Sequence, residues 1–294
     1  MIKFFNLIYY FLKKYNIITL VKKMSKILIT LNNTKLIQKS LDKVSGYVIG
    51  IKGFCVNYPS FNLDEVLKII DFCNKNGKEI YIVLNKNIHN NELEEVKQIL
   101  TTLKNINGLF YYDNAIIGLK NKLKLEYELV FDQEHQATNY LTINKYYEIG
   151  VKYVHLSNDI TLREMKEIKE NTKSKIIVTV FGYLPMFASQ RHLIKNYLDK
   201  FNLSDNSNIN YMSKEGKDYK IIDNELGTFV YTDSIFSMLD SIKEIENIDY
   251  ILFNSYLIDD FEYVLDNINN YKNIDSKYNT KPYFKDVETI YKVK

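Results

Sequence analysis

The chain has 294 residues, of which 46% are hydrophobic and 26% are charged, and its formal net charge is +3. This composition is typical of a globular protein with one large or two small domains, and such mild basicity does not by itself indicate a nucleic-acid-binding domain. The two cysteines, Cys55 and Cys73, are too few for a four-thiolate zinc or iron–sulfur site, so we expect no iron–sulfur cluster. We expect both thiols to be free, in a cytoplasmic protein.

Residues 1–23 contain an apolar run at 4–12 that is followed by Lys13 and Lys14. The run is too short to span a bilayer and no small-residue cleavage site follows it, so we expect neither a membrane span nor a signal peptide. One interpretation of this segment is an amphipathic surface anchor. Because Met24 stands just before the first clear strand, we favour an extension upstream of a true start at Met24.

From residue 26 onward, apolar runs typical of strands alternate with amphipathic patterns typical of helices. The predicted strands are residues 26–31, 46–51, 80–84, 108–112, 125–131, 153–156, 176–180 and 250–253. The predicted helices are residues 33–41, 62–77, 90–103, 116–119, 141–149, 161–172, 235–245 and 261–268. Thr161 and Glu164 fit a capping box at the start of one of these helices.

The order of these elements predicts an α/β fold, a (β/α)8 TIM-type barrel. Its strands are continuous apolar runs, as expected where both faces of a strand are buried. An open doubly wound sheet is the alternative, but no GxGxxG motif follows an early strand. We therefore expect a single barrel domain over residues 24–272 and a loosely held polar tail at 273–294.

An insertion is expected after strand seven, at about residues 193–233. Its polar middle, residues 202–210, predicts a loop. Residues 220–223 and 228–231 predict the two strands of a hairpin around the sequence Asn-Glu-Leu-Gly at 224–227.

A barrel of this kind places its active site at the carboxyl ends of its strands, so the polar residues that follow each strand are site candidates. They are Asn85, His89, Asp113, Asn114, Asp132, Glu134, His135, Gln136, Ser157, Asn158, Tyr183, Arg191, His192, Asn254 and Ser255. Most are amides, hydroxyls and single charges, which suit hydrogen bonding to a polar or anionic ligand. Arg191 offers a bidentate fork for an anion.

From the sequence we predict no metal site, and we cannot identify a catalytic nucleophile. The histidines form no HExxH pair, and the acidic residues beside His135 fit a solvated loop better than a set of metal ligands. His155 lies within a predicted strand and is expected to be a packed, hydrogen-bonded core residue. Neither cysteine has an evident base, and the chain contains no GxSxG elbow.

A series of motifs carries a resemblance to a known family. They are GYVIGIKGF (46–54), FNLDEVLKII (61–70), VLNKNIHNNEL (83–93), QATN (136–139), LSNDITLREMKEI (156–168), VFGYLPMFASQR (180–191) and DNELGTFVYTDS (223–234). In this order and spacing, the chain resembles the collagenase-like peptidase family, a bacterial group of unassigned catalytic type. The resemblance extends from about residue 26 to residue 268.

The chain departs from this family at its signature segment, which has His-Gly, then Cys, then Ser-Gly-Arg-Cys. Here Phe181-Gly182 replaces His-Gly and Pro185 stands at the first Cys position, whereas Ser189 and Arg191 match. The loop after the second strand has Cys55-Val56-Asn57 where family members often carry Ser-Ala-Arg. A thiol-based or metal–thiolate mechanism therefore cannot be carried over to this chain.

The resemblance implies three alternative functions. The first is prephenate-dependent 5-hydroxylation of the tRNA wobble uridine, with tRNA as the partner and prephenate as a small anionic co-substrate. The second is a peptidase acting on peptides or collagen-like substrates, and the third is a non-catalytic subunit that partners a longer homologue. We favour the first, because Arg191 together with neutral hydrogen-bond donors suits a dicarboxylate ligand.

Within this hypothesis, Arg191 and His192 are the catalytic candidates. The expected substrate-binding residues are Asn85, His89, Gln136, Asn139, Ser157, Tyr183 and Ser189. Asn139 has an equally favoured alternative role, as the cap of the helix that follows it.

Overall fold

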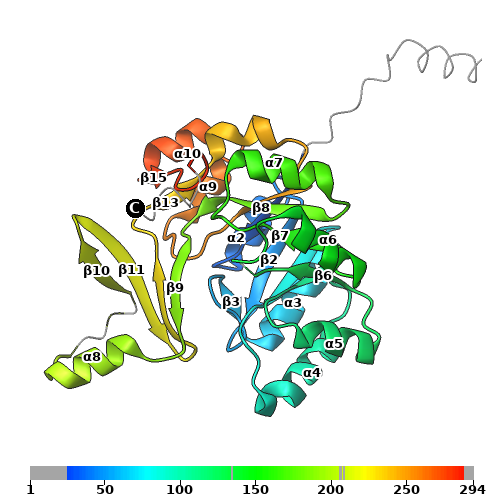
Figure 1. The fold of residues 1–294 in the computed structure, drawn as a ribbon, viewed down its shortest axis with the longest axis horizontal. Helices are drawn as coiled ribbons and strands as arrows, with labels where there is room; N and C mark the ends of the chain where they lie inside the picture. The colour runs from blue at the N-terminus through cyan, green and yellow to red at the C-terminus, as the bar shows by residue number, and fades with distance from the viewer. Residues whose placement is uncertain (1–24, 134, 205–206, 208, 288–294) are drawn as a thin grey trace, which may run out of the picture.

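Eight parallel strands close into a barrel (Figure 1). The computed structural model describes residues 25–133, 135–204, 207 and 209–287, so Met24, the extension before it and Glu134 lie outside the described residues. The barrel closes because β14 pairs in parallel with both β8 and β1. The barrel strands are β1 (Lys26–Thr30), β2 (Gly46–Ile51), β4 (Glu79–Leu84), β5 (Gly108–Tyr111), β6 (Glu128–Phe131), β7 (Tyr153–His155), β8 (Lys175–Gly182) and β14 (Tyr250–Phe253). The predicted (β/α)8 barrel is therefore confirmed.

The interior of the barrel is filled by aromatic and aliphatic side chains. Tyr81 is 1% exposed and packs edge-to-face on Phe110 and Tyr250, with ring centroids 6.0 Å apart in both pairs. Val83 and Leu252 belong to the same buried cluster. Because the interior is a packed core, a ligand can reach the barrel only at one of its ends.

Helices follow the strands and cover the outside of the barrel (Figure 1). They are α2 (Lys35–Ser40), α3 (Leu63–Lys75), α4 (Leu93–Thr102) after the short 3-10 helix η1 (Asn90–Glu92), α5 (Ala115–Leu123), α6 (Tyr140–Glu148), α7 (Leu162–Asn171), α9 (Phe261–Asp266) and α10 (Tyr271–Lys277). The predicted capping box at α7 is confirmed, since Thr161 and Glu164 hydrogen-bond each other's backbone amides. Within the described ranges, no helix combines the length and the apolar character that a bilayer crossing requires.

Between β8 and β14 the chain leaves the barrel and builds a second sheet, which projects from one side of the molecule (Figure 1). This sheet and its helix, residues 185–231, are called the arm. The arm consists of β9 (Pro185–Ser189), α8 (Leu193–Phe201), β10 (Asn210–Lys214), β11 (Lys217–Asn224) and β12 (Gly227–Tyr231), with strands in the antiparallel order β10-β11-β12-β9. The predicted hairpin is confirmed in β11 and β12, whereas β9, β10 and α8 were not predicted.

The predicted helix over residues 235–245 is wrong. Residues 235–237 form the strand β13 (Ile235–Ser237), which pairs antiparallel with β8, and only the part after it is helical, as the 3-10 helix η2 (Leu239–Ile245). Ile235 and Phe236 are 4% and 1% exposed, so this apolar run is buried on both sides. A short apolar run of this kind does not distinguish a buried strand from a buried helix.

The described part of the C-terminal segment is held more firmly than the sequence suggests. β15 (Thr280–Lys281) pairs in parallel with β13, and Ile274 of α10 is fully buried. Lys285 is 5% exposed and forms an ion pair with Asp240 at 2.8 Å. These contacts continue the fold through residue 287, beyond the expected end of the barrel domain at residue 272.

Candidate functional site

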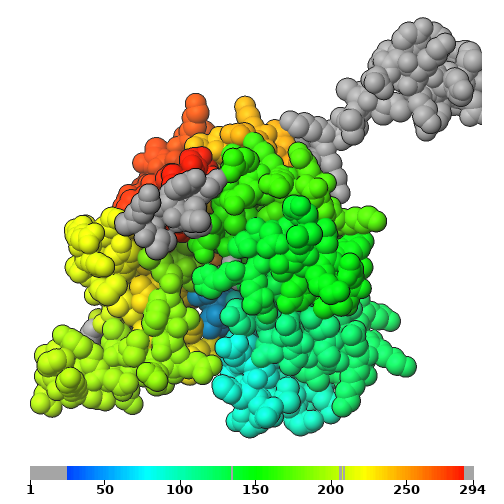
Figure 2. Space-filling view, viewed as in Figure 1, coloured from blue at the N-terminus to red at the C-terminus, as the bar shows by residue number. Residues whose placement is uncertain are grey.

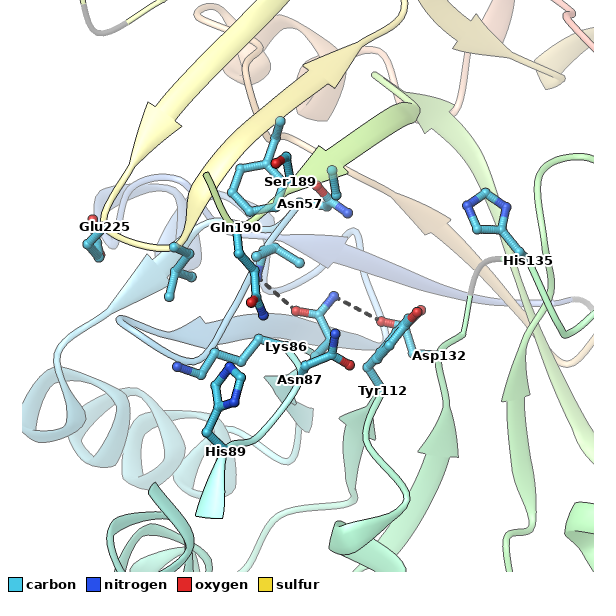
Figure 3. A pocket seen from close by; sticks show the side chains of 15 residues that line it. Asn57, Lys86, Asn87, His89, Tyr112, Asp132, His135, Ser189, Gln190 and Glu225 are labelled. Carbon is cyan, nitrogen blue, oxygen red and sulfur yellow. Dashed lines mark hydrogen bonds between the residues drawn. The ribbon is translucent and has the colours of Figure 1, made fainter. Parts of the chain in front are cut away.

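A pocket of about 450 Å³ lies at the carboxyl ends of the barrel strands, between the barrel and the arm. Figure 2 shows the hollow between these two parts, and Figure 3 shows its lining side chains. The pocket is lined by Val56, Asn57, Asn85, Lys86, Asn87, His89, Tyr112, Asp132, His135, Ala188, Ser189, Gln190, Glu225, Leu226 and Phe229. It therefore lies at the end of the barrel where the sequence predicted the site.

The floor of the pocket is a buried hydrogen-bond network around Asp132, which is 3% exposed. His155 Nδ1 lies 2.7 Å from Asp132 Oδ1, and Asn85 Nδ2 donates to Asp132 Oδ2 at 3.3 Å. The Tyr58 hydroxyl lies 3.3 Å from both carboxylate oxygens, and His155 Nε2 lies 2.8 Å from Thr179 Oγ1. A buried carboxylate requires such partners, because an unpaired charge away from water is costly.

Neighbouring strands bring this network together. Asn85 follows β4, Asp132 follows β6, His155 ends β7 and Thr179 lies in β8, so their side chains meet at one end of the barrel. Asn85 also holds the loop after β2, because its Oδ1 accepts a hydrogen bond from the Val56 amide at 2.8 Å (Figure 3). The floor is thus held by groups from four strands and one loop.

The rim on the barrel side carries Lys86, Asn87 and His89 (Figure 3). Lys86 forms an ion pair with Glu92 and lies over the Phe54 ring at 4.8 Å. Burial alone would raise the pKa of Glu92, but hydrogen bonds from Lys86 and the His89 backbone, together with the Lys86 charge, hold this pKa below its usual value. Lys86 is therefore already partnered by a carboxylate.

The opposite wall comes from the arm. Ser189 and Gln190 lie at the end of β9, and Leu226 and Phe229 come from the hairpin of β11 and β12. Gly227 allows this wall to close, because it has a φ of +124° and a Cβ there would lie 2.0 Å from the Ser189 carbonyl oxygen. Only glycine fits at this contact between the hairpin and β9.

Three of the nine predicted catalytic and substrate-binding residues line the pocket, namely Asn85, His89 and Ser189, and the strand-end candidates Asp132 and His135 line it as well. Arg191 and His192 follow directly after the pocket wall but are not among the lining residues. Arg191 is exposed, and its backbone amide donates to Ser189 Oγ at 3.2 Å. His192 Nδ1 lies 2.9 Å from Asp223 Oδ1, so this histidine faces the arm.

The other four predicted ligand contacts lie outside the pocket lining. Gln136 is exposed, and Ser157 is 2% exposed and accepts a hydrogen bond from the Asp159 amide. Tyr183 lies under the Lys220 ammonium, 4.1 Å from its ring centroid. Asn139 accepts a hydrogen bond from the Thr142 amide at 2.9 Å and so caps α6, which is the alternative role predicted for it.

Several strand-end candidates hold the fold instead of facing the pocket. Asp113 accepts hydrogen bonds from the Ile88 and Ala115 amides. Ser255 Oγ lies 2.8 Å from Thr30 Oγ1, across the seam where the barrel closes. A position directly after a strand is therefore not sufficient to place a polar residue in this site.

Sequence reasoning missed five charged or amide-bearing lining residues, Asn57, Lys86, Asn87, Gln190 and Glu225. Lys86 and Asn87 follow Asn85 directly, and Gln190 precedes Arg191, so extending each strand-end candidate by its neighbours identifies three of them. Asn57 comes from the loop between β2 and β3 (Ser60–Phe61), and no strand-end signal marks it. His155 has the packed, hydrogen-bonded position expected for it, but its partner Asp132 places the pair under the pocket.

The thiols are poor nucleophiles in this fold. Burial, with a smaller contribution from the Asp132 charge, raises the pKa of the Cys55 thiol far above its ordinary value. Burial raises the pKa of Cys73 to about 12. Among the residues that the structure describes, no group of three or more His, Cys, Asp or Glu side chains is arranged to hold a metal ion. The chemistry visible in the pocket is hydrogen bonding by amides around a buried carboxylate.

The chain matches Peptidase family U32 over residues 31–290. The tRNA hydroxylation protein P2 of Bacillus subtilis (strain 168) is 26% identical over 195 residues, which are 63% of this chain and 63% of that protein. An uncharacterized protease of Methanocaldococcus jannaschii is 29% identical over 48% of this chain and 36% of its own length. The tRNA hydroxylation protein P1 of B. subtilis is 22% identical over 53% of this chain and 36% of its own length.

These matches cover 63%, 36% and 36% of the three relatives, so the chain spans less than two-thirds of the length of each. Among solved structures, the U32 peptidase Mk0906 is similar over 54% of this chain and 70% of its own, with a TM-score of 0.47 and 12% identity. The family match extends over most of the sequence, from residue 31 to residue 290. The chain therefore belongs to peptidase family U32.

Proposed function

We propose that this chain acts in tRNA hydroxylation, in the formation of 5-hydroxyuridine at the wobble position. The observation that carries the proposal is the pocket at the barrel mouth, whose lining is rich in side-chain amides and contains no buried thiolate. Such a lining suits the recognition of a polar ligand. The names of the B. subtilis relatives, which are tRNA hydroxylation proteins, support the same assignment.

Peptide-bond hydrolysis has less support from the site. Ser189 is the one serine in the pocket lining of the described chain, and its Oγ accepts a hydrogen bond from the Arg191 amide. None of the described histidines hydrogen-bonds to it, whereas an activated serine requires an adjacent base. Cys55 and Cys73 are buried with raised thiol pKa values. The peptidase alternative therefore lacks an assembled nucleophile among the described residues.

Within the proposed function, the side chains divide into two groups. Asn85, Asn87 and Gln190 bind the ligand in the pocket through their amides. Arg191, exposed just beyond the pocket wall, binds an anionic group, such as a phosphate of the RNA or a carboxylate of prephenate, through its planar fork. We place this activity in the cytoplasm, where tRNA is modified.

The test is nucleoside mass spectrometry of tRNA from cells with and without this gene. Loss of 5-hydroxyuridine on deletion, restored by the wild-type chain, is the expected result. An unchanged nucleoside profile in cells that hold no substituting homologue contradicts the proposal.

A second complementation experiment distinguishes a chain that binds a ligand in its pocket from a chain that acts only as a non-catalytic subunit of a longer homologue. The variant Asn87→Ala with Gln190→Ala removes two lining amides that make no side-chain hydrogen bond within the described chain. Failure of this variant to restore 5-hydroxyuridine is expected if the pocket binds a ligand. Full restoration, together with co-purification of a longer homologue, favours the subunit role.

A further inference from the structure

The Asp132 carboxylate has an acceptor position that no described residue fills. An ionised carboxylate offers about four lone-pair positions. Three donors surround Asp132: the His155 ring, the Asn85 amide and the Tyr58 hydroxyl, whose one proton is shared between the two carboxylate oxygens. Asp132 also belongs to the pocket lining, and Figure 3 shows it among the lining side chains. A ligand in the pocket can therefore meet this carboxylate, provided that the ligand brings a hydrogen-bond donor.

The charges of the pocket disfavour an anionic ligand at this floor. Within the described chain, Lys86 is the one lysine or arginine of the lining, and it is partnered by Glu92. Asp132 and Glu225 place two carboxylates in the same lining. A dicarboxylate on the floor would lie against Asp132 without a free cation from the wall to offset the repulsion.

The remaining lining groups suit a flat uncharged ring. Asn87 and Gln190 carry side-chain amides that can donate to carbonyl oxygens, and neither makes a side-chain hydrogen bond within the described chain. Phe229 and Tyr112 provide aromatic surface on which a ring can pack. Asp132 on the floor can accept a hydrogen bond from a ligand, whereas Asn87 on the rim and Gln190 on the arm wall can donate hydrogen bonds to it.

We propose that this pocket binds the imide edge of a single unpaired uracil base, with the ring N3–H donating to Asp132 and the carbonyl oxygens accepting from Asn87 and Gln190. This inference rests on the proposed function, because it names the part of the RNA that the pocket takes. It also separates the ligands: the neutral base enters the pocket, and an anionic group binds outside it at Arg191.

The test is a double-mutant cycle between the protein and the RNA. The probe is an RNA stem-loop with one uridine at the tip of its loop, compared with the same RNA carrying N3-methyluridine at that position. Its dissociation constants are measured by fluorescence anisotropy for the full chain and for Asp132→Asn. Glu215→Gln is the matched control, because it makes the same change of charge at an exposed turn of the arm, outside the pocket lining.

The expected result is a loss of roughly 10- to 100-fold in affinity from either change alone, since each removes a hydrogen bond to a charged group. The two changes together lose little more than one alone, because they remove the same contact. Glu215→Gln keeps the preference for uridine over N3-methyluridine. Millimolar prephenate, used as the dicarboxylate probe, leaves the preference for uridine over N3-methyluridine unchanged, because an anion bound at Arg191 affects both RNAs alike.

Additive losses from Asp132→Asn and the N3-methyl group overturn the inference, and so does loss of the preference for uridine over N3-methyluridine in the presence of prephenate. If Asp132→Asn does not fold, the wild-type chain still decides, since equal affinity for the two RNAs overturns the inference without any variant. Failure here is distinguishable from failure of the proposed function. Gene deletion could abolish cellular 5-hydroxyuridine while the purified chain binds uridine and N3-methyluridine RNAs equally. That combination rejects only the proposed base-binding geometry and keeps the proposed function.

Discussion

At the scale of single residues, the buried pair of Asp132 and His155 is the feature that joins stability to the site. Asp132 is 3% exposed and His155 is 6% exposed, so neither group is solvated by bulk water. The carboxylate is tolerated because it accepts from His155, Asn85 and Tyr58, and His155 is held in turn by Thr179. The same hydrogen bonds that stabilise this charge also fix its orientation below the pocket.

We predict that His155→Ala lowers the free energy of unfolding by about 3 kcal/mol, because it leaves a buried carboxylate without its shortest hydrogen bond. Urea unfolding measures the change. The control is Lys145→Ala, which breaks an exposed ion pair with Glu148 and is expected to change the free energy by less than about 0.5 kcal/mol. Equal effects of the two substitutions contradict the role given to the buried network.

The sequence identified part of this network and could not identify the rest. Asn85 and Asp132 follow apolar runs, so their position at the carboxyl end of the barrel was predictable from the fold class alone. The pairing of Asp132 with His155 depends on how two neighbouring strands are staggered, and Tyr58 arrives from a loop without regular structure. Local sequence patterns carry no information on such contacts between distant segments.

At the scale of elements, the arm is held together by one carboxylate and one glycine. Asp223 in β11 accepts from the Ile194 and Lys195 amides at the start of α8 and pairs with His192. Gly227 in β12 lies against the Ser189 carbonyl of β9. These two contacts fix α8 and the pocket wall to the same hairpin.

We predict that Gly227→Ala costs roughly 2–4 kcal/mol of stability, because its φ of +124° strains an L-residue and the new Cβ would lie 2.0 Å from the Ser189 carbonyl oxygen. Gly216→Ala in the same sheet is the matched control. Gly216 also has a positive φ, +73°, but no atom lies within 4 Å of a Cβ there, so about 1 kcal/mol is expected. Thermal unfolding of both variants measures the difference, and a loss at Gly227 no greater than at Gly216 contradicts the close contact.

We predict that Asp223 contributes stability that acid removes. Burial alone would raise its pKa, but hydrogen bonds from His192 and from the Lys195 and Ile194 amides hold the pKa of Asp223 below its ordinary value of 3.8. A carboxyl group with a lowered folded-state pKa stabilises the fold above its unfolded pKa, and this stabilisation disappears as the pH falls through the folded-state pKa.

The wild-type chain should therefore lose more stability than Asp223→Asn as the pH falls from about 5 toward 2. Urea midpoints across this range measure the effect. Asp199→Asn, an exposed change of the same charge on α8, is expected to retain the wild-type pH dependence. Parallel curves for the wild type and Asp223→Asn would show that the contacts of Asp223 do not stabilise the fold.

The elements that the sequence predicted correctly are those with a strong local pattern. The eight apolar strands and the hairpin of β11 and β12 have such patterns. β9 was not predicted, because Met186 and Phe187 are about half exposed and its partner β12 is remote in sequence. The helix predicted over residues 235–245 failed where Phe236 and Ser237 pair with the last two residues of β8, beyond the part of β8 that pairs with β7. This tertiary pairing overrides local propensity.

At the scale of the whole molecule, the pocket exists because two parts of the fold meet. The barrel supplies a floor with a buried carboxylate, and the arm supplies a wall whose last residues lead directly to Arg191. An insertion after strand seven was predictable, but its return over the barrel mouth was not. Binding at this site therefore depends on the arm as well as on the barrel.

Arg191 offers the sharpest test of this arrangement. Its side chain is exposed and forms no hydrogen bond or ion pair with the described part of the chain, whereas its backbone is held by Ser189 and Thr228. We predict that Arg191→Ala leaves the unfolding midpoint unchanged and lowers tRNA 5-hydroxyuridine in complemented cells at least about tenfold, the loss expected for a charge-assisted contact. Lys195→Ala removes an exposed positive charge one helical turn away and is expected to restore full modification. If the two variants restore modification to the same level, the anion contact does not lie at Arg191. An equal loss of modification in both variants would then reflect general attraction of RNA by the positive charges of the arm. A loss confined to Arg191→Ala places the anionic group directly beyond the pocket wall, next to the position that we propose for the base.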